Sequence, residues 1–218
     1  MICSFMLVFS LMSARLDCRE GDKLECKTIT RKSDDFRAFK ALYKSSFPRS
    51  ERAPIWFLLS RARKDNIRLC VYCDKGEPVG LANYVLHNDL TYVVYLAVCE
   101  NRRSEGYGSR ILGKLKADYP GNRIVLTIEM VDERAGNNEQ RMRRKRFYEK
   151  NGFAAAGINV KHMGGLYELL AQGGSCSVKE FDVLSKIFIG SVIYPLTKPK
   201  IVRVVLTALS LFYLLLAS

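Results

Sequence analysis

The stretch Val98-Cys-Glu-Asn-Arg-Arg-Ser-Glu-Gly-Tyr-Gly-Ser109 decides the fold of this chain. It follows an apolar run at 91–98 that predicts a buried strand, and it leads into an amphipathic pattern at 108–118 that predicts a helix. Gly106 and Gly108 let backbone amides approach an anion, and the first turn of the helix adds unpaired amides and a positive dipole end. The turn therefore predicts a pyrophosphate-binding loop. It is neither a P-loop nor the three-glycine dinucleotide fingerprint.

The pattern on both sides of this loop predicts an α+β fold. Pro54 opens a short helix that has Trp56 and Leu59 on its apolar side. Helices and strands alternate irregularly, which favours a mixed, mostly antiparallel central sheet with helices on both faces over a doubly wound sheet. The expected strands are 24–30, 67–73, 79–86, 91–98, 123–130, 155–160 and 166–170, and the expected helices are 36–47, one from 54, 108–118, 139–150 and 177–188.

A second motif, Arg146-Phe-Tyr-Glu-Lys-Asn-Gly-Phe153, ends the basic helix expected about forty residues downstream. The loop resembles the R-x-x-G-x-G motif of the GNAT N-acetyltransferases, and this helix end resembles their R-x-F-Y-x-x-x-G-F pattern. The resemblance covers residues 24–172. Ser46-Phe-Pro-Arg-Ser-Glu-Arg52 is further similar to a segment of a bacterial subgroup of that family.

The resemblance implies that acetyl-CoA is the co-substrate. Members of the family bind its pantetheine arm between two splayed strands and its pyrophosphate on the glycine loop. The implied binding residues are the strand residues Leu96, Ala97 and Val98, the loop residues Arg103, Ser104, Glu105, Gly106, Tyr107 and Gly108, and the side chain of Ser109.

The resemblance also implies two catalytic candidates. Tyr148 matches the family's general acid, and a phenol with a pKa near 10 stays protonated beside a departing thiolate. Many members carry a base on the strand that here reads Tyr92-Val-Val-Tyr95, so Glu129 on the next strand is the substitute. The alternative to a catalytic role is that Tyr148 is a packed aromatic residue and that Glu129 is an exposed acid at the end of its strand.

The implied function is transfer of an acetyl group to a primary amine by direct attack. The acceptor is a small-molecule amine or a peptide or protein amine. A non-catalytic CoA-binding regulatory module, held at a membrane by the C-terminal tail, is the alternative function.

The composition of the chain restricts the classes of partner that we expect. The net charge of +13 suits anionic partners, and Arg141, Arg143, Arg144, Lys145 and Arg146 crowd one helix, but the aromatic interleaving of RNA-binding sheets is absent, so we expect no nucleic acid. Seven scattered cysteines argue against a secreted disulfide framework, so we expect a cytoplasmic protein, either free or associated with a membrane through residues 201–218. Both a monomer and a homodimer stay open. Cys70 and Cys73 share the C-x-x-C spacing, but on a strand they point to opposite faces, so we predict no metal site.

The organisation along the chain is predicted in four parts. Residues 1–20 are an apolar N-terminal extension that a misplaced start codon would also explain, and 21–175 form the acetyltransferase domain. Residues 176–200 are a C-terminal helix and linker, and 201–218 are an apolar tail. A helix over 204–217 would reach about 21 Å, short of the bilayer core, so a membrane anchor and a helix packed on a protein surface both stay open.

Overall fold

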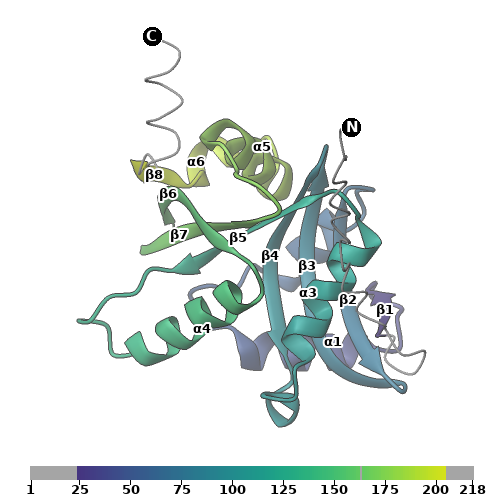
Figure 1. Ribbon diagram of the computed structural model, residues 1–218. Coiled ribbons are helices and arrows are strands. Elements are labelled where there is room, and N and C mark those ends of the chain that lie inside the picture. Colours follow the sequence, from purple (N-terminus) through teal and green to yellow (C-terminus); the bar gives the residue numbers. More distant parts are fainter. Residues whose placement is uncertain (1–23, 163, 205–218) are drawn as a thin grey trace, which may run out of the picture.

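A single twisted sheet organises the described part of the protein, which in this computed structural model comprises residues 24–162 and 164–204. The strands lie in the order β1-β2-β3-β4-β5-β7-β6-β8 (Figure 1). β4 and β5 are parallel, and the other neighbouring pairs are antiparallel, so the predicted mixed, mostly antiparallel sheet is confirmed. The strands are β1 Glu25–Thr28, β2 Ile67–Asp74, β3 Glu77–His87, β4 Leu90–Val98, β5 Arg123–Glu129, β6 Ala154–His162, β7 Gly165–Gln172 and β8 Lys200–Val204.

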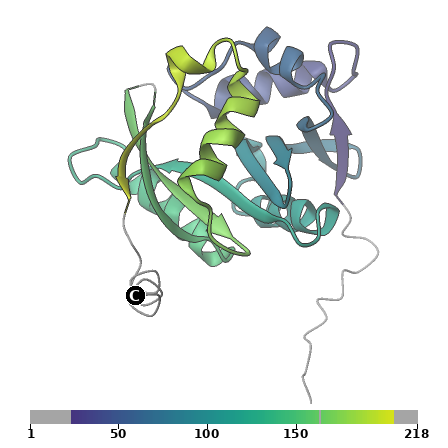
Figure 2. The same cartoon turned by 90° about the horizontal axis from the view of Figure 1, so that it is seen from above.

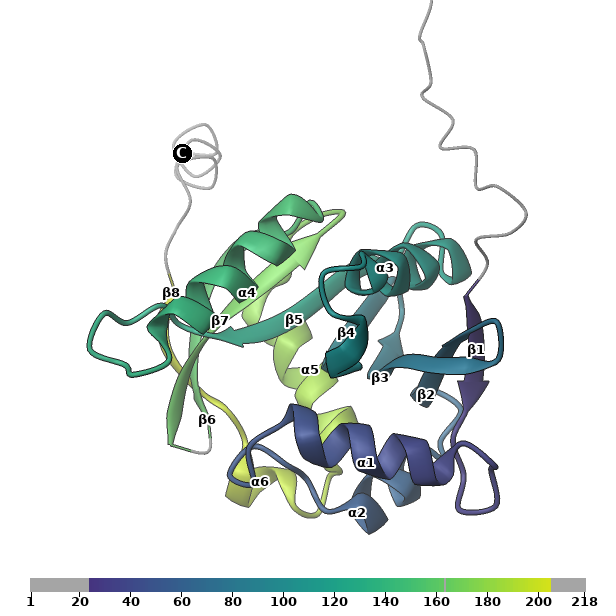
Figure 3. The ribbon, with the colours of Figure 1, turned by 90° about the horizontal axis from the view of Figure 1, so that it is seen from below.

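Helices cover both faces of this sheet (Figures 2 and 3). Successive side chains of β2 point to opposite faces of the sheet and so contact different helices. Cys70 and Tyr72 pack in a cluster with α3, whereas Leu69 and Val71 pack in a cluster with α1 and α2. α4 shares the α3 face, and α5 lies on the face of α1 and α2. The helices are α1 Phe36–Ser46, α2 Ile55–Arg61, α3 Tyr107–Asp118, α4 Asn138–Lys150, α5 Val178–Ile189 and α6 Tyr194–Thr197, with a 3₁₀ turn, η1, at Glu100–Arg102.

The sheet divides between β4 and β5. These parallel strands pair from Leu90 with Arg123 as far as Val93 with Leu126, and no pairing follows among the described residues. A bulge at Val94, opposite the step from Asn83 to Tyr84 in β3, bends β4 at the same level. Beyond that level β4 follows β3 and β5 follows β7, which leaves a gap with unpaired backbone groups on the β4 side (Figure 3).

The C-terminal part packs onto the domain and joins the sheet. β8 pairs with β6, from Ile158 with Val204 to Lys161 with Lys200, so the predicted boundary at residue 201 lies within a strand. The predicted N-terminal extension and residues 205–218 of the predicted tail lie outside the described residues. Within the described ranges, the helices are too short or too polar to cross a membrane.

The predicted apolar side of α2 is not its buried side. Leu58 is the buried residue of this helix, while Trp56 is 62% exposed and Leu59 is only half-buried. The helix has only seven residues, so rotating it by one residue changes which side chains face the core. The sequence of so short a helix does not determine that rotation. The exposed indole stands beside the cavity described below.

The start of α5 makes the stability of the fold dependent on pH. Ser177 and Glu180 form a capping box, and Arg123 donates a hydrogen bond of 2.7 Å to the Glu180 carboxylate. The Arg123 bond, followed by those from Ser177, lowers the pKa of Glu180 from 4.5 to about 2. Because the folded state depresses this pKa, the carboxylate stabilises the fold above about pH 4.5 and loses that effect as the pH falls toward 2.

We therefore expect Glu180→Gln to lower the free energy of unfolding by about 1 kcal/mol at neutral pH. Urea titrations of both proteins between pH 2 and pH 7 measure the difference, which should shrink toward acid. Glu139→Gln is the matched control, because Glu139 also lies in the first turn of a helix but is 85% exposed and 3.9 Å from its partner Arg143. A difference for Glu180→Gln that does not change with pH would contradict the assignment.

Candidate functional site

The gap between β4 and β5 opens into a cavity of about 1270 Å³. Its floor comes from the separated ends of the two strands, and one end is closed by the loop that follows β4. The other end is bordered by the loop before α2 and by the C-terminal ends of α5 and α6. The predicted site residues Leu96, Ala97, Val98, Arg103, Ser104, Gly106, Tyr107, Gly108, Ser109, Glu129 and Tyr148 all line it.

The loop after β4 presents backbone amides at the cavity. Ser104 and Gly106 have φ of 66° and 83°, which turns the chain sharply before α3. Arg110 is the first residue of α3 whose amide bonds back, to the Gly106 carbonyl at 3.0 Å. Across the described chain, the amides from Ser104 to Ser109 make no hydrogen bond, and a Cβ built on Gly106 would meet nothing within 4 Å. Open space lined by free amides at a helix N-terminus fits an anionic phosphate group.

Side chains brace this loop from behind. The Tyr107 ring lies between the guanidinium groups of Arg102 and Arg110, at 4.9 and 4.8 Å from its centroid. Its hydroxyl donates to Asp74 at 2.8 Å and accepts from Arg102 at 2.5 Å. The hydrogen bonds from Arg110 and Tyr107 lower the pKa of Asp74. Tyr107 is thus held in the body of the protein, which leaves its backbone amide as the group at the cavity.

Glu105 is the one predicted binding residue that is absent from the cavity lining. Its carboxylate lies 3.5 Å from the Nε of Arg102. A contribution from Glu105 is therefore limited to its backbone amide, which is the group that the family resemblance implies.

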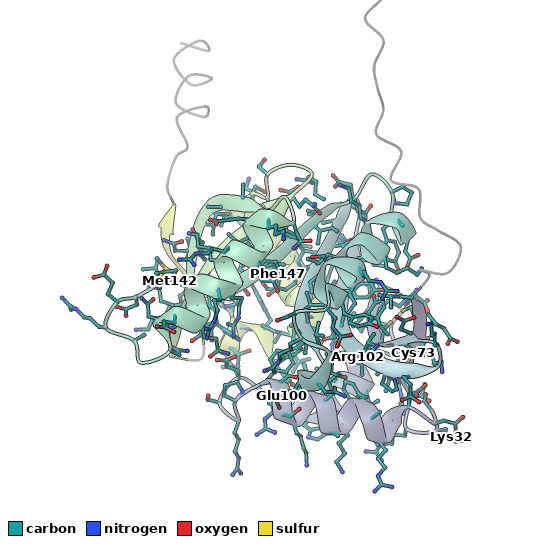
Figure 4. All side chains as sticks on the ribbon, turned by 60° about the horizontal axis from the view of Figure 1, so that its bottom comes forward. Lys32, Cys73, Glu100, Arg102, Met142 and Phe147 are labelled. Carbon is teal, nitrogen blue, oxygen red and sulfur yellow. The ribbon has the colours of Figure 1, made fainter. Side chains whose placement is uncertain are left out.

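α4 borders the loop from the other side of the gap. A Cβ on Gly108 would lie 2.8 Å from the Phe147 ring, so α3 and α4 touch at a position that only glycine fills without displacement. Phe147 sits on the end of α4 that faces the gap, and Arg102 lies across from it beyond the end of β4 (Figure 4). The second motif of the sequence thus completes the cavity that the first motif begins.

Tyr148 projects from α4 into the core at the cavity wall. It is 8% exposed, and its ring packs edge-on to Phe147 and Phe153 at centroid distances of 5.0 and 5.5 Å. Burial raises the pKa of Tyr148 to about 12, against a smaller opposite effect of Arg144. The raised pKa keeps the hydroxyl protonated. Because the hydroxyl makes no hydrogen bond within the described residues, it is available to a ligand in the cavity.

Glu129 ends β5 and is held by α4. Its Oε1 lies 3.0 Å from Arg141 and its Oε2 lies 3.2 Å from Arg144, and the side chain is 15% exposed. Lys145 bonds Glu168 of β7 at 2.8 Å. Part of the basic face of α4 therefore binds the sheet through ion pairs, while Arg143 and Lys150 remain on the cavity wall.

The sequence analysis missed Glu51, which lines the same cavity. The Tyr95 hydroxyl donates to the Glu51 carbonyl at 2.8 Å and accepts from the Ala53 amide at 3.1 Å, and Tyr43 donates to the Ala53 carbonyl at 3.1 Å. Burial raises the pKa of the Glu51 carboxyl, and the nearby charge of Glu129 raises it further. The motif at 46–52 marked this segment but did not show that it faces the cavity.

The structure also bears on Cys99 as a nucleophile and on potential metal ligands. Cys99 donates to the Pro78 carbonyl at 3.3 Å, and burial raises the pKa of its thiol, so it is not an activated nucleophile. No cluster of three or more potential metal ligands exists among residues 24–162 and 164–204.

Comparison with known proteins shows which family the chain is similar to. A GNAT acetyltransferase domain model matches residues 65–155. Among solved structures, a GNAT-family protein from Bacteroides thetaiotaomicron is 23% identical with a TM-score of 0.62, over 78% of this chain and 98% of its own. No curated protein matches the sequence.

Two further solved structures share the fold. An aminoglycoside 6'-N-acetyltransferase complexed with coenzyme A is 16% identical with a TM-score of 0.52, over 68% of this chain and 96% of its own. The ribosomal-protein-S18-alanine N-acetyltransferase from Escherichia coli is 13% identical with a TM-score of 0.52, over 71% and 96%. At these identities the similarity shows the fold alone.

Proposed function

We propose that this chain, which matches a GNAT acetyltransferase domain model over residues 65–155, is an acyltransferase that transfers the acetyl group of acetyl-CoA to a primary amine by direct attack. The observation that carries this proposal is the gap between β4 and β5, which leads from free loop amides to the hydroxyl of Tyr148. A solved neighbour with this fold was crystallised with coenzyme A.

The loop and β4 would hold the co-substrate. The free amides from Ser104 to Gly108 bind the pyrophosphate, and Ser109 adds a side-chain donor. Leu96 to Val98 pair with β3 on one side, and their backbone groups on the side of the gap would pair with the pantetheine arm as an additional strand would. Bound acetyl-CoA supplies an activated thioester, whose acetyl group then lies between β4 and β5.

Tyr148 would act as general acid. The amine nitrogen attacks the acetyl carbon, the bond from carbon to sulfur breaks, and the phenol gives its proton to the departing sulfur. Its high pKa keeps the phenol protonated over the working pH range. Direct attack agrees with the half-buried thiol of Cys99, which donates to the Pro78 carbonyl and offers no activated nucleophile for a covalent acetyl-enzyme.

Glu129 contributes negative charge at the acceptor end of the cavity. Both of its carboxylate oxygens are held in ion pairs, one with Arg141 and one with Arg144. We propose that Glu129 holds α4 against β5 and orients the amine through its charge.

The test is release of free CoA thiol from acetyl-CoA by the purified full chain, with and without pooled amines. We expect amine-dependent thiol release and an acetylated amine that mass spectrometry detects. Binding of acetyl-CoA with no transfer to any amine, peptide or polyamine in the pools would overturn the enzymatic proposal.

A further inference from the structure

We propose that the acceptor is a primary monoamine with an aromatic or branched apolar body, and that the carboxylate of Glu51 takes the proton from its ammonium group. The inference rests on the proposed acetyl transfer and names its substrate class and its base. Three features of the cavity carry it: one uncommitted carboxylate, apolar walls and an otherwise basic lining.

The cavity offers one carboxylate that is not already paired. Among the described lining residues the acids are Glu51 and Glu129, and two guanidinium groups occupy the oxygens of Glu129. In the same described set, the Glu51 carboxylate forms neither a hydrogen bond nor an ion pair. Tyr95 holds the backbone of Glu51 through its carbonyl, so the point from which the side chain extends is fixed at the cavity. One free carboxylate matches one ammonium group.

The surroundings of Glu51 favour a base. Burial first, and then the charge of Glu129, raise the pKa of its carboxyl group. A carboxylate with a raised pKa accepts a proton from an ammonium group more readily than an exposed one does. The charged and titratable groups around it are Arg52 in its own loop, Tyr95 of β4, Glu129 of β5, Arg141 and Arg144 of α4, and Tyr167 of β7.

The walls beside Glu51 are apolar. Phe57 of α2 and Phe188 of α5 meet edge-on at a centroid distance of 5.8 Å, and Arg61 fixes the two helices by donating to the Phe188 carbonyl at 2.7 Å. Trp56 is 62% exposed and Ile193 is 42% exposed on the same lining. Large apolar side chains left open on a cavity wall gain from an apolar ligand that covers them.

The remaining charges disfavour a polycation. Six arginine or lysine residues line the cavity, namely Arg52, Arg102, Arg103, Arg143, Arg144 and Lys150, and the whole chain has a net charge of +13. A second or third ammonium group on the acceptor would lie among like charges without a free carboxylate to receive it. A polyamine or an aminoglycoside is therefore a poor fit, whereas a monoamine loses its charge to Glu51 before it reacts.

The step balances as follows. The ammonium group gives one proton to the Glu51 carboxylate, and the free amine forms a bond to the acetyl carbon. The bond from that carbon to sulfur breaks, and Tyr148 protonates the sulfur. The amide nitrogen releases its remaining extra proton to water, which reprotonates Tyr148, and Glu51 loses its proton to solvent. The products are an N-acetylamine, CoA thiol and one proton.

The first experiment measures kcat/KM of the full chain for 2-phenylethylamine, isoamylamine, spermidine and a peptide that starts with alanine. We expect the two apolar monoamines to exceed spermidine and the peptide by about 100-fold. Equal or better turnover of spermidine or the peptide would overturn the substrate class while leaving acetyl transfer intact. Transfer to none of the four, despite bound acetyl-CoA, would also count against the inference, and the pooled-amine assay then decides whether acetyl transfer itself fails.

The second experiment changes the base. Glu51→Gln keeps size and polarity, and with 2-phenylethylamine we expect kcat to fall about 100-fold at pH 7 while acetyl-CoA affinity stays the same. As the pH rises toward the amine's own pKa, the lost activity should recover about tenfold per pH unit, because a growing share of the amine then arrives already deprotonated. Glu77→Gln, an exposed glutamate at the start of β3, is the matched control and should behave as wild type. A Glu51→Gln enzyme that still binds acetyl-CoA but shows normal turnover, or a loss that does not change with pH, would overturn the role.

The third experiment changes the wall. Ile189 is half-buried at the end of α5 and lines the cavity, so Ile189→Glu adds a second carboxylate there. We expect the preference for 2-phenylethylamine over spermidine to fall at least about tenfold, because a second ammonium group then has a partner. An unchanged ratio would show that this wall does not contact the acceptor and would overturn the apolar-body assignment.

Discussion

A Tyr148→Phe enzyme is expected to lose about 10²- to 10⁴-fold in kcat, the range typical of general acid catalysis. The substitution removes the hydroxyl and keeps the ring that packs against Phe147 and Phe153. The hydroxyl makes no hydrogen bond within the described residues, so folding loses little when it is removed. KM for acetyl-CoA should therefore change little, and the loss should be specific to turnover.

Steady-state kinetics with the best amine of the panel measure this effect, alongside a thermal denaturation curve that checks folding. Tyr119→Phe is the matched control, because its hydroxyl contacts Tyr84 at 3.3 Å and it is absent from the cavity lining. A Tyr148→Phe kcat within about twofold of wild type would leave water or the substrate ammonium as the proton source. Tyr148 would then be a packing residue.

The pKa of Tyr148 adds a pH criterion. Because burial raises this pKa to about 12, the phenol stays protonated throughout the range in which the amine becomes deprotonated. Below about pH 11, ionisation of Tyr148 should therefore cause no decline in the wild-type kcat. The pH profiles of wild type and Tyr148→Phe should have the same alkaline shape in that range.

The loop and the sheet could be predicted from local sequence because local chemistry determines them. Free amides at a strand-to-helix turn need glycine at 106, and the buried run at 91–98 needs apolar residues on both faces. The order of elements then restricts the sheet to few topologies. The divergence of β4 from β5 was implied only by the family resemblance, since it arises from a bulge at Val94 that no residue type marks.

The acceptor end was less predictable because it depends on contacts between distant segments. Glu51 is placed by Tyr95, 44 residues away, and the wall of α5 is placed by Arg61, 127 residues from Phe188. The pairing of Glu129 with Arg141 and Arg144 shows the same limit, although the spacing of three does put both arginines on one helix face. α6 went unrecognised because it has only four residues, and β8 because its apolar residues continue into the tail without a turn signal.

A Gly106→Val protein is expected to bind CoA about 10- to 100-fold more weakly than wild type. Gly106 has φ of 83°, where a β-branched residue costs about 1 to 3 kcal/mol, so the loop relaxes and its free amides no longer converge. The added side chain also enters space that is open in the protein and that the pyrophosphate would fill. Each tenfold loss corresponds to about 1.4 kcal/mol, so strain and obstruction together account for the range.

Calorimetric titration of CoA into the folded variant measures this loss. Gly121→Val separates strain from obstruction, because Gly121 has φ of 87° with no atom within 4 Å but lies in the turn after α3, at the helix end opposite the loop. We expect Gly121→Val to lower stability by a similar amount and to retain CoA affinity. A folded Gly106→Val protein with unchanged affinity would show that the pyrophosphate binds elsewhere, because no phosphate could approach the amides of this turn past a valine side chain.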